Sequence, residues 1–138
     1  MVGLVLVSHS RALVEGLRDI VAQFGGDDVP VALAGGTPDG RLGTTADTIV
    51  AGIRAVLGSS SGDGDGAVVL FDFGSAALSL EIALEELDPV ERGRVRVPEA
   101  PLVEGAFAAG VQASIGGSLD EVAAAAAAAI HLSKTIGG

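Results

Sequence analysis

The sequence predicts an α/β domain of three layers, in which helices cover both faces of a mainly parallel four-stranded sheet. Two observations support this prediction. Short, continuously apolar runs alternate along the chain with segments of about 10–15 residues whose apolar positions recur at helical spacing. The apolar runs are not interrupted by polar residues, which is typical of strands buried on both faces of a parallel sheet. The length of 138 residues fits a single domain spanning residues 1–138.

Apolar patterns and turn-forming residues delimit each element. In chain order, we expect a strand at 2–7, a helix at 13–24, a strand at 29–34, a helix at 44–57, a strand at 67–73, a helix at 76–87, a strand at 94–97, and helices at 103–114 and 118–133. Strands that alternate with helices in this way are joined by right-handed crossovers. We therefore expect a parallel sheet with the strand order 2-1-3-4.

The expected strands differ in how apolar they are. Val2–Val7 and Ala67–Phe73 consist almost entirely of Val, Leu and other apolar residues, so both are predicted to be buried on two faces. Val29–Ala34 ends at a pair of glycines, which marks a turn. Arg94–Val97 is short and more polar, and we place it at an edge of the sheet.

Capping residues predict where the helices begin and end. Thr44–Asp47 is similar to a capping box, and Ser118–Glu121 is a capping box that opens the last helix. Ser75 is expected to cap the helix at 76–87, which Asp88-Pro89 closes. The Gly, Ser and Asp tract at 58–66 is interpreted as a loop inside the domain, because strand and helix signals continue after it.

The composition excludes several classes of function. Eight Lys and Arg against 18 Asp and Glu give a net charge of −10, which argues against a nucleic-acid partner. The absence of cysteine excludes disulfides, thiolate metal ligands and cysteine nucleophiles. Two histidines in distant segments make a poor metal site, so no metal is expected on the chain. The apolar start is too short for a signal peptide or a membrane span, and we expect a cytoplasmic protein with no membrane partner.

Known catalytic motifs are also missing. The sequence contains no phosphate-binding loop of the G-x-x-x-x-G-K-[ST] type and no G-x-S-x-G nucleophile elbow. Its one lysine, Lys134, lies near the C-terminus. A receiver-type aspartyl phosphoacceptor at Asp72 would need an acidic pair after the first strand, where the chain has Ser8-His9-Ser10 instead.

The polar residues that follow the strands predict a site. In a sheet of order 2-1-3-4, the loops after the first and third strands meet where the strand order reverses, and ligands bind there. This topology places His9 beside Asp72. Ser10, Thr44 and Ser75 are expected nearby, at helix N-termini whose N–H groups favour an anion, and Gly43 and Gly74 belong to the same loops.

This pair of side chains has two interpretations. A carboxylate that accepts from the Nδ1–H of a histidine leaves Nε2 free as a base or nucleophile, and the helix ends could hold a transferred phosphoryl group. Alternatively, His9 is a polar residue that caps the first helix and Asp72 stabilises its own turn. For Ser10, Thr44 and Ser75 the alternative is simple N-capping, which does not exclude anion binding.

Four motifs resemble a known family. They are Val5-Leu6-Val7-Ser8-His9-Ser10, Gly43-Thr44, Asp72-Phe73-Gly74-Ser75-Ala76 and Ala100-Pro101-Leu102-Val103-Glu104-Gly105. In order and spacing they are similar to the phosphotransfer subunit of bacterial phosphotransferase-dependent dihydroxyacetone kinase, which has the mannose-type IIA fold. The first motif is shared with sugar-transport IIA domains, whereas the third and fourth point to the dihydroxyacetone branch.

The resemblance implies a phosphoryl relay. His9 would accept a phosphoryl group from phospho-HPr and pass it to ADP on the nucleotide-binding kinase subunit, while Asp72 would orient the imidazole. Ser10, Gly43, Thr44, Gly74 and Ser75 would face the phosphoryl group. No cofactor is then expected on this chain, because ADP, ATP and magnesium would lie on the partner subunit. Members of the family are commonly homodimers.

Two alternatives stay open at this stage. One is a mannose-type IIA domain of a sugar transporter, which would deliver the phosphoryl group to a sugar-specific IIB domain. The other is a non-catalytic regulatory module that uses the same fold for binding. Some members of the family carry further phosphotransfer domains after the IIA domain, so a chain of 138 residues is expected to be a separate IIA unit that depends on a separate HPr.

Overall fold

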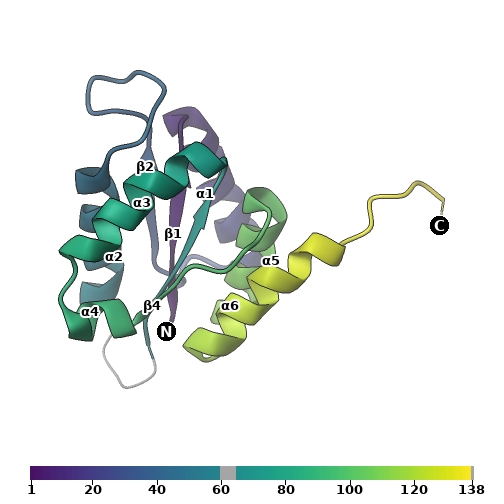
Figure 1. Cartoon of the computed structure of the whole chain (residues 1–138). Coiled ribbons are helices and arrows are strands. Elements are labelled where there is room, and N and C mark those ends of the chain that lie inside the picture. Colours follow the sequence, from purple (N-terminus) through teal and green to yellow (C-terminus); the bar gives the residue numbers. More distant parts are fainter. Residues whose placement is uncertain (60–64, 138) are drawn as a thin grey trace.

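The computed structural model describes residues 1–59 and 65–137 and contains the predicted parallel sheet (Figure 1). Its strands are β1 (Gly3–Ser8), β2 (Val31–Gly35), β3 (Ala67–Phe71) and β4 (Val95–Arg96), and their order is β2-β1-β3-β4. All three strand pairs are parallel. The three-layer α/β fold and the strand order 2-1-3-4 are therefore confirmed, and the short β4 lies at an edge as expected.

Strand β1 lies in the middle of the sheet and is buried over its whole length. Its side chains alternate between two hydrophobic cores, because successive residues of a strand point to opposite faces. Leu4 and Leu6 belong to one core, and Val5 and Val7 belong to the other. This explains the continuous apolar run, since both faces of the strand need apolar side chains.

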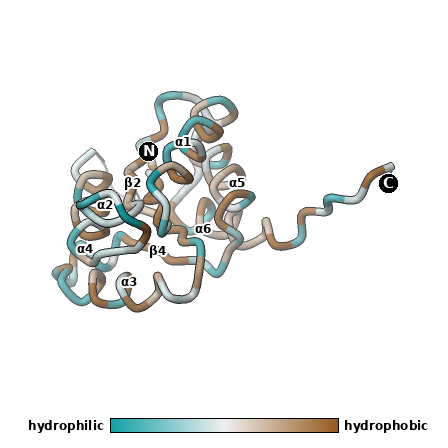
Figure 2. Tube along the Cα trace, turned by 90° about the horizontal axis from the view of Figure 1, so that it is seen from above, coloured by the Kyte–Doolittle hydropathy of each residue, from teal (hydrophilic) through white to brown (hydrophobic). Residues whose placement is uncertain are grey.

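The helices form the two outer layers (Figure 2). They are α1 (Arg11–Gly25), α2 (Ala46–Ser59), α3 (Gly74–Glu86), α4 (Pro89–Gly93), α5 (Leu102–Ser114), α6 (Leu119–Ala128) and the 3₁₀ turn η1 (Ala129–His131). Helices α1, α5 and α6 cover the face of Leu4 and Leu6, whereas α2 and α3 cover the face of Val5 and Val7. Each helix layer thus buries one side of the same central strand.

Two helix starts differ from the sequence predictions. Helix α2 begins at Ala46, and the hydroxyl of Thr45, not that of Thr44, accepts the hydrogen bond from the N–H of Thr48 at 3.4 Å. Helix α3 begins at Gly74, so Ser75 lies inside the first turn and does not cap it. Both capping predictions were wrong by one or two residues. The hydroxyls of Thr44 and Ser75, which were predicted to cap these helices, contact other segments instead.

One helix was missed, and two further ends were wrong. Asp88-Pro89 does close α3, whose C-cap is Leu87, but it also opens the short helix α4, in which Asp88 and Glu91 form a capping box with proline in the first turn. The last helix ends at Ala128 and continues only as η1, several residues before the predicted end at 133. Strand β3 ends at Phe71, which leaves Asp72 and Phe73 in the loop.

Part of one predicted loop lies outside the described residues, and the described helices are too short or too polar to cross a membrane. The Gly, Ser and Asp tract was predicted to be a loop, but residues 60–64 of it lie outside the described residues. Among the helices of the described part of the chain, none has the length and apolar character needed to cross a membrane.

The carboxyl end of β2 packs tightly against the start of α1. A Cβ atom on Gly35 would lie against the Val14 side chain and only 2.9 Å from both the Arg11 Cα and the Ser10 carbonyl oxygen. Two of these neighbours are backbone atoms, which cannot rotate away. The absence of a side chain at Gly35 therefore sets how closely the loop of His9 approaches β2.

We predict that Gly35→Ala lowers the free energy of unfolding by about 1–3 kcal/mol, because overpacking displaces the backbone. The matched control is Gly16→Ala on α1, where an added Cβ meets nothing within 4 Å. That substitution should raise the free energy of unfolding by about 0.5–1 kcal/mol, since alanine is the better helix former. Urea denaturation of both variants measures the difference, and equal effects would contradict the packing argument.

Candidate functional site

The loops after β1 and β3 meet at one edge of the sheet because the two strands are paired neighbours. His9 follows β1 and Asp72 follows β3. The His9 Nδ1 atom lies 3.0 Å from Asp72 Oδ1 and 3.2 Å from Asp72 Oδ2. The predicted juxtaposition of these two residues, which are 63 positions apart in the chain, is confirmed.

The carboxylate of Asp72 is held by several donors at once. Its Oδ2 accepts from the Ser8 hydroxyl at 2.8 Å and from the His9 backbone N–H at 3.0 Å. Its Oδ1 accepts from the Phe73 N–H at 2.8 Å. Burial alone would raise the pKa of Asp72, but these bonds and the one from the imidazole favour the ionised form and lower the pKa below its ordinary value.

The contacts of the His9 ring define which nitrogen is free. Because the ionised Asp72 carboxylate can only accept, the proton of the neutral imidazole is assigned to Nδ1. Nε2 then carries a lone pair, and it lies 2.9 Å from the hydroxyl of Ser75, which donates to it. The His9 side chain is 26% exposed, so the ring is partly accessible to another molecule.

Two residues of this site were missed by the sequence analysis. Ser8 is fully buried; besides donating to Asp72, its hydroxyl accepts the Ser10 N–H at 3.0 Å. The ring of Phe73 lies 5.6 Å from the His9 ring, centroid to centroid. For Ser8 a signal was available, because a polar residue at the end of a buried strand needs a hydrogen-bond partner.

The loops around His9 are fixed by capping and by a backbone bond. Ser10 is the N-cap of α1, and its hydroxyl accepts from the Leu13 N–H at 3.2 Å. The N–H of Gly43 donates to the His9 carbonyl at 2.9 Å. Gly43 has φ +145°, a conformation that L side chains rarely adopt, so glycine suits this contact.

The other two predicted residues are Thr44, in the loop before α2, and Gly74, at the start of α3. The Thr44 hydroxyl donates to the Ser79 hydroxyl of α3 at 2.9 Å, which ties the loop to the helix. Gly74 begins α3, and an added Cβ there would meet nothing within 4 Å. The N-cap residue Phe73 makes no side-chain hydrogen bond to the first turn of α3, and Gly74 and Ser75 in that turn are exposed.

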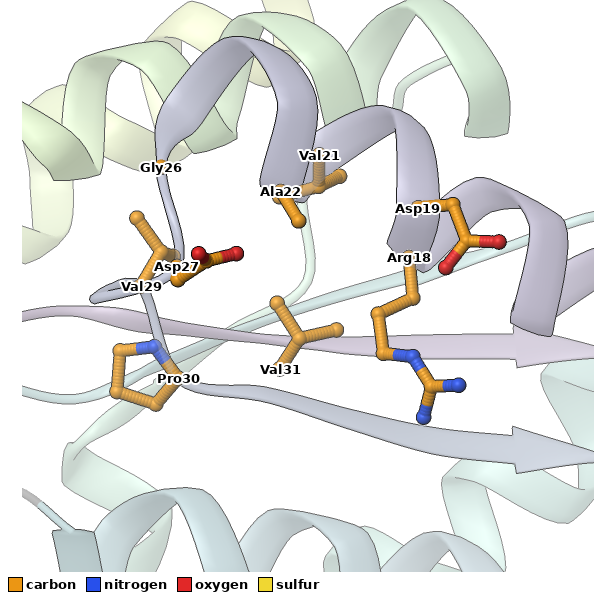
Figure 3. Close-up of a pocket in the computed structure, with 9 residues that line it drawn as sticks. All are labelled: Arg18, Asp19, Val21, Ala22, Gly26, Asp27, Val29, Pro30 and Val31. Atoms are coloured by element: carbon orange, nitrogen blue, oxygen red, sulfur yellow. The ribbon is translucent and has the colours of Figure 1, made fainter.

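Among the described residues, neither a cluster of metal ligands nor the cavity beside the C-terminal half of α1 includes His9. Within residues 1–59 and 65–137, no three His, Asp or Glu side chains are grouped as metal ligands; the expectation of no metal on the chain stays a prediction. A cavity of about 490 Å³ opens between the C-terminal half of α1 and β2, where Arg18 reaches from α1 toward the strand (Figure 3). It includes Pro30 and Val31, at the amino end of β2, and is therefore distant from His9.

Comparisons with known proteins find relatives that match most of the chain. The family model EIIA-man, described as "PTS system fructose IIA component", matches residues 3–123. A Listeria innocua protein named PEP-dependent dihydroxyacetone kinase 2, phosphoryl donor subunit DhaM, is 41% identical over 88% of this chain and 94% of its own length. DhaM subunits of Pantoea ananatis and Escherichia coli are 44% and 42% identical, but the chain spans only 25% of each.

A solved structure has the same fold. The protein EF1359, described as being of unknown function, superposes with a TM-score of 0.79 at 31% identity, covering 92% of this chain and 94% of that protein. The parallel sheet and the layers of helices are therefore shared with a crystal structure of a relative.

The lowered pKa of Asp72 predicts how stability depends on pH. Because the folded-state pKa lies below the ordinary value of 3.8, the ionised carboxylate stabilises the fold above pH 3.8. That contribution is lost as the pH falls through the folded-state value. We expect the wild type to be more stable than Asp72→Asn at neutral pH, and the difference to shrink below pH 3.8. Chemical denaturation of both proteins across this range measures it, and a difference independent of pH would contradict the assignment.

Proposed function

This chain belongs to the EIIA-man family, alongside the DhaM phosphoryl donor subunits of PEP-dependent dihydroxyacetone kinases, and on that premise we propose that His9 relays the phosphoryl group of such a kinase. In this proposal His9 accepts the group from phospho-HPr and transfers it to ADP on the nucleotide-binding kinase subunit. ADP, ATP and magnesium belong to that subunit, so this chain needs no cofactor of its own. The relay operates in the cytoplasm, and this subunit works as a homodimer.

The observation that supports the proposal most is the orientation of the His9 imidazole. Asp72 accepts from Nδ1, which leaves the lone pair on Nε2, where it accepts from the exposed Ser75 hydroxyl. An imidazole held in this tautomer is a nucleophile that needs no deprotonation before it reacts. A histidine that only capped helix α1 would not need a carboxylate bonded to Nδ1, and Ser10 already caps that helix.

Each of the two transfer steps is an in-line displacement at phosphorus, in which one bond forms as another breaks. In the first, the Nε2 lone pair attacks phosphorus, an N–P bond forms, and the bond between phosphorus and the donor's imidazole nitrogen breaks with its electron pair returning to that nitrogen. In the second, a β-phosphate oxygen of ADP attacks the same phosphorus and the electron pair returns to Nε2. Asp72 keeps the Nδ1 proton in place and stabilises the positive charge that develops on the ring.

The neighbouring residues suit a phosphoryl group on Nε2. When Nε2 becomes bonded to phosphorus it can no longer accept from Ser75, so the Ser75 hydroxyl is released to donate to a phosphoryl oxygen. The uncapped N–H groups at Gly74 and Ser75 supply further donors at a helix N-terminus. We assign Ser10, Gly43 and Thr44 a positioning role, since Ser10 caps α1, the Gly43 N–H donates to the His9 carbonyl and the Thr44 hydroxyl donates to Ser79.

Phosphorylation of purified protein tests the proposal. Incubation with phosphoenolpyruvate, enzyme I and HPr should give one acid-labile, alkali-stable phosphate on His9, located by mass spectrometry. His9→Gln should abolish the labelling, because the amide has no nucleophilic ring nitrogen. His131→Gln is the matched control and should label like the wild type. Labelling that survives in His9→Gln would falsify the relay through His9.

One specific observation favours a second function. The matching family model is described as a fructose IIA component, and a sugar-transport IIA domain would use the same histidine chemistry. The acceptor distinguishes the two functions. Phosphorylated protein mixed with the nucleotide-binding kinase subunit and ADP should form ATP under the proposed function, whereas transfer only to a sugar-specific IIB domain would establish the transport function.

Asp72→Asn tests the role of the carboxylate. The amide NH₂ of asparagine can donate to Nδ1, which moves the ring proton to Nε2 and removes the nucleophilic lone pair. We expect the phosphorylation rate to fall by about 10²–10⁴-fold, in the range found when a histidine is held in the wrong tautomer. Rapid-quench phosphorylation measures the rate, with Asp39→Asn in an exposed loop as the control. A rate within twofold of wild type, measured where Asp72→Asn is folded, would remove the carboxylate from the mechanism.

A further inference from the structure

Two side chains of opposite charge line the cavity between α1 and β2 without pairing. Arg18 of α1 and Asp27 of the turn that follows this helix lie on either side of Val31 in the cavity of about 490 Å³ (Figure 3). Within residues 1–59 and 65–137, neither side chain makes an ion pair or a hydrogen bond. The other arginines in that part of the chain each pair with a carboxylate or donate to a backbone carbonyl. The cavity therefore presents a cation and an anion that are both available to a ligand.

The rest of the lining is mostly apolar. Val21 and Val29 are buried, with 1% and 5% of their surface exposed, and Pro30 and Val31 line the side of β2. Sites for small molecules combine an apolar lining with a few polar groups that fix the orientation of the ligand, and their volumes run from about 300 to 1,000 Å³. This cavity has room for an apolar group beside the two charges.

The backbone of β2 adds a donor and an acceptor to the same cavity. In the sheet, β2 is an edge strand that pairs with β1. The N–H of Leu4 in β1 donates to the carbonyl of Pro30, directly before Val31. Alternate residues of a parallel strand bond to the same neighbour, so the N–H and C=O of Val31 point away from β1, toward the open edge. A ligand beside this edge can therefore bond to the backbone as well as to the charged side chains.

The charges of the lining select the kind of ligand. Asp19 also lines the cavity, so two carboxylates and one guanidinium face it. A simple anion is repelled by the carboxylates, and a simple cation is repelled by Arg18. A ligand that carries both a carboxylate and an ammonium group suits both signs of charge. A guanidinium binds a carboxylate through two parallel N–H donors, and an ammonium group donates to an aspartate.

We propose that this cavity binds a small zwitterion with an apolar side chain, such as a branched-chain α-amino acid or a short apolar peptide. The carboxylate of the ligand pairs with Arg18, its ammonium group pairs with Asp27, and its side chain packs against the apolar lining. The site lies at the amino end of β2, whereas His9 follows the carboxyl end of β1. Binding here is therefore independent of the phosphoryl chemistry proposed for His9.

Titration of isotope-labelled protein with leucine, followed by NMR, tests the site. We expect saturable shifts of the amide signals of Ala22, Gly26 and Val31, with a Kd of about 1 mM or lower. Leucinamide lacks the carboxylate and isocaproate lacks the ammonium group. Each should bind about tenfold or more weakly than leucine, because each loses a charge-assisted hydrogen bond. Leucylleucine is titrated in parallel, and the tighter binder of the two zwitterions shows whether the site takes an amino acid or a peptide.

Two variants show which residue binds which end of the ligand. Arg18→Gln should weaken the binding of leucine about tenfold or more and leave that of leucinamide unchanged, whereas Asp27→Asn should weaken leucine and leave isocaproate unchanged. Arg41→Gln and Asp28→Asn are the matched controls, because neither residue lines the cavity, and both should bind leucine like the wild type. All four side chains are exposed, so the variants should fold, which urea denaturation checks.

The remaining outcomes decide against the site. The absence of saturable shifts with both leucine and leucylleucine would overturn the proposal. Leucinamide and isocaproate that bind as tightly as leucine would also overturn it, and so would an Arg18→Gln protein that binds leucine like the wild type. His9→Gln should bind leucine like the wild type, and weaker binding would contradict the independence of the two sites. Phosphorylation of His9 is measured separately, so failure of the relay and failure of this site are distinguishable.

Discussion

The hydrogen bond between Asp72 and the Nδ1 atom of His9 is the interaction on which the rest of the site depends. It determines the tautomer, and the tautomer determines that Nε2 carries the lone pair. The bond exists only because β1 and β3 are paired neighbours that end at the same edge of the sheet. A partly buried, ionised carboxylate also needs compensation, which Ser8 and two backbone N–H groups provide. The chemistry of the site is thus a consequence of strand pairing.

The central strand β1 contributes side chains to both hydrophobic cores and also positions the loop of His9. β1 is apolar on both faces because helices cover both, and it ends in the polar sequence that begins with Ser8. The rigid sheet fixes the backbone of His9, while Gly35 and Gly43 allow β2 and the following loop to approach it closely. Polar groups placed on rigid elements are more precisely positioned than groups on free loops. The His9 side chain is partly exposed at the carboxyl end of the sheet, which suits a group that is passed between proteins.

The sequence predicted the fold and the His9–Asp72 pair because both follow from the order of apolar runs and from topology. It did not predict which hydroxyl caps which helix. A shift of one or two residues in the start of α3 changes Ser75 from a cap into a partner of Nε2, and such a shift lies within the usual uncertainty of helix ends. Pro89 was interpreted only as part of the signal that ends α3, although proline is also favoured in the first turn of a helix, here α4. The Ala-rich α6 carries no stop signal before its end at Ala128, because alanine favours a helix throughout.

The exposure of a single nitrogen has a kinetic consequence. Donor and acceptor both need to place an atom in line with the same Nε2, so they cannot occupy the site together. A relay through His9 would then follow a substituted-enzyme, or ping-pong, scheme in which each partner leaves before the next arrives. Unphosphorylated forms of either partner would act as competitive inhibitors of the other. The flux through such a subunit would depend on how quickly its partners dissociate as much as on the chemical step itself.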